Sequence, residues 1–331
     1  MNGTNGMNNG MNRRRFAQIV AATGALPFGA WAQDVYPNRP LKLVVPLPAG
    51  GAADVNARTL AARLQQQLGQ PVVVENKPGG SFVIGMQAIG TAPADGHSMI
   101  AINTGMVAAQ LTLGRINLLE SLTPVSTTGT TPCQLVVPAS SPFRTPGELV
   151  EYGRRNPGKL NYGSVGVGTL EHLWCTLFGR TMGFEATHVP FKGMPDAITA
   201  LVQGELHFIP SVFSISNPHV QRGNLRCLAI LSDKRHDNAP DTPTLKEQGV
   251  NVRPMEFWGG LAVAKGTPPA LVERLRKEIN LGLQDRSVTE KLRTFGSTPV
   301  GSVSVEAFTA LIQSDIQWMT QVIRDGNMKF S

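Results

Sequence analysis

The sequence predicts an α/β protein built as two lobes. Short apolar runs of strand length repeatedly end at glycine and are followed by segments with helical spacing of apolar residues. That alternation is typical of sheets whose strands are joined by helices. Two glycine-rich segments of this kind, residues 48–54 and 163–169, lie far apart in the chain. With 331 residues, the chain is long enough for two domains of ordinary size.

The N-terminal half starts with an apolar run at residues 41–45, as expected for a strand that is buried on both faces of a sheet. Gly69 is a typical residue to end the helix that follows. We expect further elements at 72–74 (strand), 82–89 (helix) and 99–102 (strand). The apolar residues of the first helix share one stripe: Ala57, Leu60, Ala61, Leu64 and Leu68.

The rest of the chain continues the same alternation. The large apolar residues behind the second glycine loop have helical spacing, so we expect them in a core. These residues are Leu170, Leu173, Trp174, Leu177 and Phe178. The pattern predicts strands at 134–137, 160–162, 187–190, 206–209 and 227–231, and helices at 149–155, 196–203, 268–283 and 305–323.

Residues 1–32 have the features of an export signal. Three arginines at 13–15 precede an apolar run at 19–30, and Ala30-Trp31-Ala32 is a small-x-small cleavage site. We therefore interpret 1–32 as a signal peptide, with Met1, Met7 and Met11 as alternative starts. Its Arg-Arg-x-Phe pattern fits the twin-arginine route as well as the general secretory route.

Charge, cysteine content and motifs exclude several classes of protein. Removal of the signal's three arginines lowers the formal net charge from +7 to +4, too little to indicate nucleic-acid binding. Cys133, Cys175 and Cys227 are an odd number with no C-x-x-C pair, so we expect buried free thiols, with one disulfide as the alternative. Neither glycine loop matches a nucleotide-binding motif, so we expect no cofactor and no metal.

The two glycine loops point to a binding site for an anion. A strand that ends at glycines and leads into a helix leaves backbone N–H groups at the helix N-terminus, where they attract negative charge. Asp54 lies in the first turn of one such helix, where a carboxylate can accept hydrogen bonds from free amides. The pair of loops therefore predicts two lobes that close on one small carboxylate.

An exported hydrolase or lyase is the alternative function. Ser164 lies in the second loop, and His172 or His188 would be its base. A nucleophile elbow requires G-x-S-x-G, whereas residue 162 is tyrosine. The histidines are scattered without metal-binding spacing, so we predict a binding protein and not an enzyme.

Several segments together carry a family resemblance. They read YPNRP at 36–40, LVVPLPAGGAADV at 43–55, VENKPGG at 74–80, APADG at 92–96, NPGKLNYGS at 156–164, HVPFKG at 188–193 and WGGL at 258–261. In this order and spacing they resemble the Bug family, the periplasmic solute receptors of tripartite tricarboxylate transporters. The resemblance covers nearly the whole chain after the signal.

The resemblance implies a type II periplasmic-binding-protein fold, with two α/β lobes and a ligand cleft between them. Lobe one would comprise residues 33–132 plus 256–331, and lobe two residues 133–255. The protein would be a periplasmic monomer that captures a small organic acid and delivers it to the permease subunits of a tripartite transporter. Candidate ligands are di- or tricarboxylates, acidic amino acids and aromatic carboxylates. A receptor that feeds a signalling partner is an alternative.

The family holds carboxylates largely through backbone amides, so the resemblance also implies site residues. Departures from the usual family pattern at Ala52-Ala53, Ser81-Phe82, Phe191 and His207 together make the site less polar and favour an aromatic or otherwise apolar carboxylate. Lobe one would contribute Ala49, Gly50, Gly51, Ala52, Asp54, Pro78, Gly79, Gly80, Ser81, Asn103 and Thr104. Lobe two would contribute Gly163, Ser164, Val165, Gly166, Thr169, Phe191 and Lys192.

Overall fold

The computed structural model describes Gly3 and residues 36–330. Residues 39–331 form one compact unit, and the fold described here is that of its residues 39–330. The predicted signal peptide lies, apart from Gly3, outside the described residues. No helix of the described part is long and apolar enough to cross a lipid bilayer.

A seven-stranded sheet runs through this unit in the order β2-β1-β3-β9-β4-β7, and β8 also pairs with β4. β1 pairs in parallel with β2 and β3, whereas the pairs of β9 and β4 are antiparallel. A separate parallel pair consists of β5 (Leu160–Ser164) and β6 (Ala186–Pro190). The strands of the large sheet are β1 (Leu41–Val45), β2 (Val72–Asn76), β3 (Ser98–Asn103), β4 (Leu122–Pro138), β7 (Ile209–Val212), β8 (Leu225–Ile230) and β9 (Glu256–Ala264).

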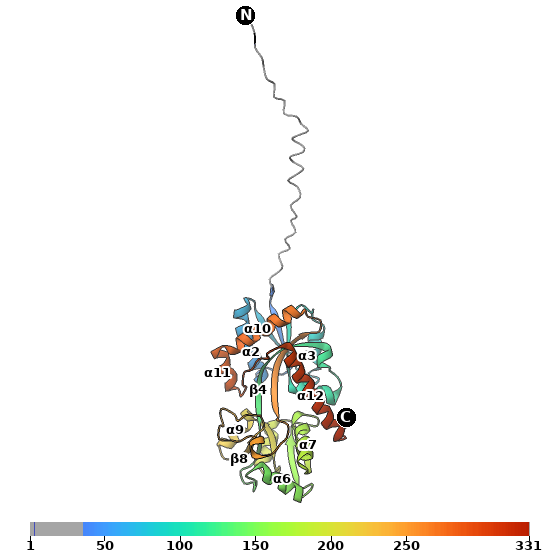
Figure 1. The fold of residues 1–331 in the computed structure, drawn as a ribbon, viewed down its shortest axis with the longest axis vertical. Coiled ribbons are helices and arrows are strands. Elements are labelled where there is room, and N and C mark those ends of the chain that lie inside the picture. The colour runs from blue at the N-terminus through green and yellow to red at the C-terminus, as the bar shows by residue number, and fades with distance from the viewer. Residues whose placement is uncertain (1–2, 4–35, 331) are drawn as a thin grey trace. The chain divides into compact units, whose positions relative to one another are not determined.

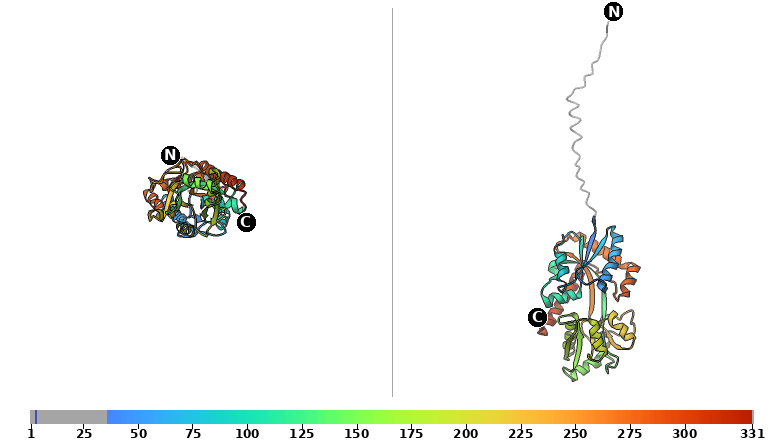
Figure 2. Two further views of the ribbon diagram at one scale, coloured as in Figure 1. Left: turned by 90° about the horizontal axis from the view of Figure 1, so that it is seen from below. Right: turned by 180° about the vertical axis from the view of Figure 1, so that it is seen from behind.

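Two lobes are joined by β4 and β9, which run side by side from one lobe to the other (Figures 1 and 2). β4 pairs with β9 as far as Pro132 and with β7 from Cys133 onward. Its 17 residues extend about 55 Å at the usual rise of a strand. One continuous strand therefore belongs to the sheets of both lobes.

Helices cover the sheets of each lobe (Figure 1). Around the first lobe lie α2 (Ala52–Leu68), α3 (Val83–Gly90), α4 (Thr104–Leu113), α5 (Leu118–Ser121), α10 (Pro269–Gln284), α11 (Arg286–Thr294) and α12 (Val305–Asp325). The second lobe carries α6 (Pro146–Arg155), α7 (Leu170–Met182), α8 (Met194–Val202), α9 (Phe213–Gln221) and a 3₁₀ turn at Lys246–Gln248.

The large apolar residues expected in a core are buried. Trp174 and Phe178 have no exposed surface, and their rings stack with centroids 5.0 Å apart. Leu170 and Leu173 are also buried, whereas Leu177 is half-buried at the edge of the same cluster. This confirms the core position predicted from helical spacing.

Asp315 attaches the C-terminal helix α12 to the strand that returns from the second lobe. Its buried carboxylate accepts hydrogen bonds from the indole N–H of Trp258 (2.6 Å) and of Trp318 (2.9 Å), and from Arg253 (3.1 Å). The arginine balances the buried charge, and the indoles satisfy the remaining oxygen lone pairs. α12 is thereby fixed against β9.

Most predicted elements are present within a few residues, but some predictions were wrong or incomplete. The strand expected at 206–209 is instead β7 at Ile209–Val212, because these residues, and not 206–208, pair with β4. The strand expected at 134–137 is only the end of β4. The sequence analysis missed α4, α9, α11 and β9.

The three cysteines are free, as expected. Cys133 and Cys175 are buried and Cys227 is half-buried. Burial raises the pKa of Cys227 to about 12, so its thiol is protonated and unreactive at neutral pH.

The packing of β9 against α12 depends on Gly260. A Cβ atom at this position would lie 2.3 Å from Cζ of Phe308 and 2.8 Å from the carbonyl oxygen of Ser126. We expect Gly260→Ala to lower the free energy of unfolding by about 1–3 kcal/mol, measured by urea denaturation. Gly90→Ala is the control, because open space surrounds this helical glycine. Equal losses in the two variants would contradict the prediction.

Candidate functional site

The loop between β1 and α2 is organised by the carboxylate of Asp54. One carboxylate oxygen accepts a hydrogen bond from the Gly50 amide (2.9 Å), and Asn76 donates to the other (2.9 Å). Arg58 donates to both oxygens from one turn later (3.0 and 3.1 Å). Burial alone would raise the pKa of Asp54, but the hydrogen bonds from Arg58, Gly50 and Asn76 outweigh it and lower this pKa.

This arrangement leaves the N-terminus of α2 open. Gly51 is the N-cap, and no side chain caps the helix. In the described part of the chain, the amides of Gly51, Ala52 and Ala53 donate no hydrogen bond, as expected for a first helical turn. Arg58 offsets the charge of Asp54, so the positive end of the helix dipole remains available to an anion.

A second turn beside this loop has an unusual backbone. Gly79, Gly80, Ser81 and Phe82 all have positive φ, at 117°, 57°, 50° and 77°. Such angles are uncommon for serine and unfavourable for a bulky residue such as phenylalanine. The strained turn directs Phe82 towards the first turn of α4, where a Cβ on Gly105 would lie 3.8 Å from the tip of the ring.

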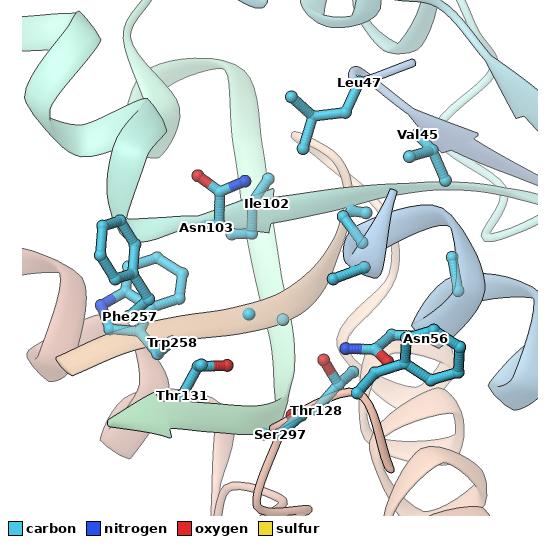
Figure 3. Close-up of a pocket in the computed structure, with 18 of the residues that line it drawn as sticks. Val45, Leu47, Asn56, Ile102, Asn103, Thr128, Thr131, Phe257, Trp258 and Ser297 are labelled. Atoms are coloured by element: carbon cyan, nitrogen blue, oxygen red, sulfur yellow. The ribbon is translucent and has the colours of Figure 1, made fainter. Parts of the chain in front are cut away.

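The open end of α2 and the ring of Phe82 line the same cavity, which has a volume of about 450 Å³ (Figure 3). Its walls come from α2, the ends of β1 and β3, the crossing strands β4 and β9, the start of α9, and α10 and α11 with the chain that follows. Thr128 and Thr131 of β4 and Phe257 and Trp258 of β9 face it. None of the described residues that line it has a charged side chain.

Of the predicted lobe-one residues, Ala52 and Asn103 line this cavity. Asn103 also caps α4, since its side-chain oxygen accepts from the Met106 amide (3.1 Å). Thr104 is buried behind the wall, where its hydroxyl accepts a hydrogen bond from the Trp258 amide (2.9 Å). The remaining predicted residues of this lobe do not line the cavity: Ala49, Gly50, Gly51, Asp54, Pro78, Gly79, Gly80 and Ser81.

The predicted lobe-two residues lie elsewhere. The hydroxyl of Ser164 lies 2.6 Å from Nε2 of His188 and accepts from the Gly166 amide (3.1 Å). The loop contacts the first lobe, because a Cβ on Gly168 would lie 2.6 Å from Thr112 of α4. None of the predicted residues of this lobe lines the cavity; they are Gly163, Ser164, Val165, Gly166, Thr169, half-buried Phe191 and exposed Lys192.

Comparison with known proteins identifies the family. A family model described as the tripartite tricarboxylate transporter family receptor matches residues 56–328. The chain belongs to this family. Protein BugT of Bordetella pertussis is 34% identical over 319 residues, which cover 94% of this chain and 95% of BugT. The predicted membership of the Bug family is thus confirmed.

Solved structures of this receptor family share the fold. A TctC solute binding protein from Polaromonas matches with a TM-score of 0.79 at 28% identity, over 88% of this chain and 99% of that protein. A protein from R. palustris, solved with adipate, matches with a TM-score of 0.71 at 31% identity, over 87% and 97% of the two chains. The two-lobed periplasmic-binding-protein fold predicted from the sequence is therefore confirmed.

The alternative enzyme function places its nucleophile at Ser164. Ser164 has no exposed surface, and its hydroxyl also donates to the Gly166 carbonyl (2.9 Å). Within the described residues, no carboxylate is hydrogen-bonded to His188 to orient it as a base. No group of three metal-ligating side chains occurs in the described part of the receptor either. The serine instead shapes its loop.

His172 and His188 stack behind this loop, with ring centroids 3.9 Å apart. Nδ1 of His172 accepts from the Gly168 amide (3.0 Å), which requires that this nitrogen carry no proton. Burial, and to a lesser degree the charge of His188, lowers the pKa of His172 to about 4. Burial also lowers the pKa of His188. Both rings are therefore neutral at pH 7.

Sequence reasoning missed most of the cavity. Ala57 belongs to the predicted helix stripe, which was interpreted only as core, and its neighbour Asn56 was not predicted. Trp258 belongs to a segment that carries the family resemblance, yet β9 was not predicted. Phe295 lies after a helix that was also missed. These segments become neighbours only in the folded chain, where β9 returns to the first lobe.

The Asp54 network predicts a large effect of its removal. Asp54→Ala removes the acceptor that the Gly50 amide, Arg58 and Asn76 share, so we expect the free energy of unfolding to fall by about 1–3 kcal/mol in urea denaturation. Asp54→Asn retains an acceptor oxygen and should lose less. A loss below about 0.5 kcal/mol in the alanine variant would contradict this role.

The stacked histidines predict a loss of stability in acid. Because the pKa of His172 is lowered from 6.5 to about 4, the unfolded chain binds protons between these pH values that the folded receptor does not. The free energy of unfolding therefore falls as the pH drops through this window. We expect His172→Gln to remove about 1–2 kcal/mol of the difference between pH 7 and pH 4.5, measured in urea.

An unchanged dependence in the His172 variant would show that this residue does not titrate in the window.

Proposed function

We propose that this receptor captures a small carboxylate between its lobes and binds the carboxylate group at the N-terminus of α2. The observation that carries the proposal is the open first turn of α2, whose amides donate no hydrogen bond and which forms part of the cavity wall. Amides at a helix N-terminus together with the helix dipole stabilise negative charge. The adipate in the R. palustris relative supports a carboxylate ligand.

Lobe closure completes the site in this proposal. The lobe-two residues named above, from Gly163 to Lys192, contribute only when that lobe swings towards α2 about β4 and β9. The change of partners along β4 between Pro132 and Cys133 supports a boundary of the lobes there, with residues 33–132 plus 256–331 in lobe one and 133–255 in lobe two. Nothing covalent happens to the ligand.

The physiological setting follows from the family. We infer that residues 1–32 direct export, that the receptor works as a monomer in the periplasm, and that the closed form delivers its ligand to the membrane permease of a tripartite transporter. Family membership supports the permease as partner over a signalling protein. We infer no cofactor and no metal for a step that consists of binding and release.

A charge placed at the proposed anion site tests the function. Ala52 is exposed on the first turn of α2, so Ala52→Asp should keep or raise the midpoint of thermal unfolding, since an acidic residue there favours the helix dipole. The same carboxylate should weaken binding of an anionic ligand at least tenfold, measured by calorimetry after a thermal-shift screen of organic acids.

Ala52→Asn has almost the same size without the charge, so its smaller loss separates repulsion from steric obstruction. Equal affinity in Ala52→Asp and the wild type would refute an anion site at α2. If no organic acid shifts the unfolding midpoint of the ligand-free wild type, the receptor proposal itself fails. A ligand present at one hundred times its dissociation constant adds about 2.7 kcal/mol, which such a screen detects.

A further inference from the structure

We propose that the ligand is a monocarboxylate with an aromatic or similarly compact apolar body. Its carboxylate lies at the N-terminus of α2, and its body fills the cavity between α2, α11 and the crossing strands. This inference rests on the proposed function, because it assumes the anion site at α2. It narrows that proposal, since di- and tricarboxylates are then poor ligands.

The cavity has a solvent-exposed mouth and an apolar interior. Ala52, Ile215 and Phe295 line it and are well exposed, with 40% of Ile215 and 39% of Phe295 accessible, so they mark the mouth. The interior is lined by Leu60 and Leu292, which are almost completely buried. The helix N-terminus thus lies at the mouth, where a carboxylate keeps part of its hydration, and an attached body extends inward.

The walls provide no counter-charge for a second carboxylate. Among residues 36–330, no aspartate, glutamate, lysine, arginine or histidine lines the cavity, and its polar side chains are neutral amides and hydroxyls. The side-chain oxygen of Asn56 is buried and has no hydrogen-bond partner, and an acceptor of this kind repels another carboxylate. A second negative charge would give up its water for hydrogen bonds from neutral amides and hydroxyls alone, with no opposite charge beside it.

Aromatic side chains give the cavity a preference for flat apolar groups. Phe82, Phe257, Trp258 and Phe295 all line it. Trp258 presents no free N–H group to a ligand, because its indole N–H donates to Asp315 and its backbone amide donates to the Thr104 hydroxyl. Phe82 adopts a left-handed backbone conformation, which is unfavourable for a bulky residue. The cavity therefore keeps this aromatic ring in place despite its conformational cost.

Calorimetry with the purified receptor tests the ligand class. The probes are benzoate and 3-phenylpropanoate as aromatic monocarboxylates, and succinate, adipate, glutamate and citrate as multiply charged or polar acids. We expect at least one aromatic monocarboxylate to bind ten times more tightly than every acid of the second group.

Two results would overturn the inference, and only one of them would also overturn the proposed function. Equal or tighter binding of succinate, adipate, glutamate or citrate refutes the apolar ligand and leaves the carboxylate receptor intact. Failure of every acid to bind folded protein refutes both. The two proposals are therefore distinguishable in one set of titrations.

Cavity variants locate the body of the ligand. Ala57 lines the interior, so Ala57→Leu reduces its volume and should weaken 3-phenylpropanoate at least tenfold. Phe295→Ala is the second variant, because a residue at the exposed mouth can be truncated without disturbing the fold; it should weaken the same ligand about threefold to tenfold. Val303→Ala, at a site 84% exposed and outside the cavity, is the matched control. Unchanged affinity in both cavity variants would refute this location.

Discussion

Hydrogen bonding between β4 and β9 is the interaction on which both lobes depend. The two strands pair antiparallel from Leu122 to Pro132, and β4 then continues as the central strand for β7 and β8. β4 therefore continues the sheet of the first lobe lengthwise into the second lobe. The lobes are thus connected by hydrogen-bonded strands and not by a flexible loop.

Two buried carboxylates hold the surroundings of the cavity in place. Asp54 uses an amide, an arginine and an asparagine to fix the loop ahead of α2. Asp315 uses two indoles and an arginine to fix α12 against β9. Each charge is fully hydrogen-bonded, which is the condition under which burial of a carboxylate specifies geometry. The open end of α2 is left as an unsatisfied set of donors beside an apolar wall.

Local patterns in the sequence predicted the α/β class and most elements, because apolar periodicity and glycine turns act over a few residues. Ala52 and Asn103, which line the cavity, were predicted from the family resemblance and not from these patterns. The local patterns failed where contacts join distant segments. Phe295 reaches the cavity only through the return of β9, and the turn at Phe82 depends on a φ of 77°, which no propensity indicates for this residue type. Asp54 was predicted as a ligand residue, and in the structure its carboxylate accepts hydrogen bonds from Gly50, Arg58 and Asn76.

The strands that join the lobes are also the floor of the cavity. Thr128 and Gly129 of β4 and Phe257 to Leu261 of β9 face the enclosed space, so any bending of these strands changes its width. In the proposed closure, the lobes move about these same strands. The thickness of the bound molecule, and not only its affinity, would then limit how far the lobes approach each other. A molecule that binds tightly but is too thick would prevent the lobes from closing fully.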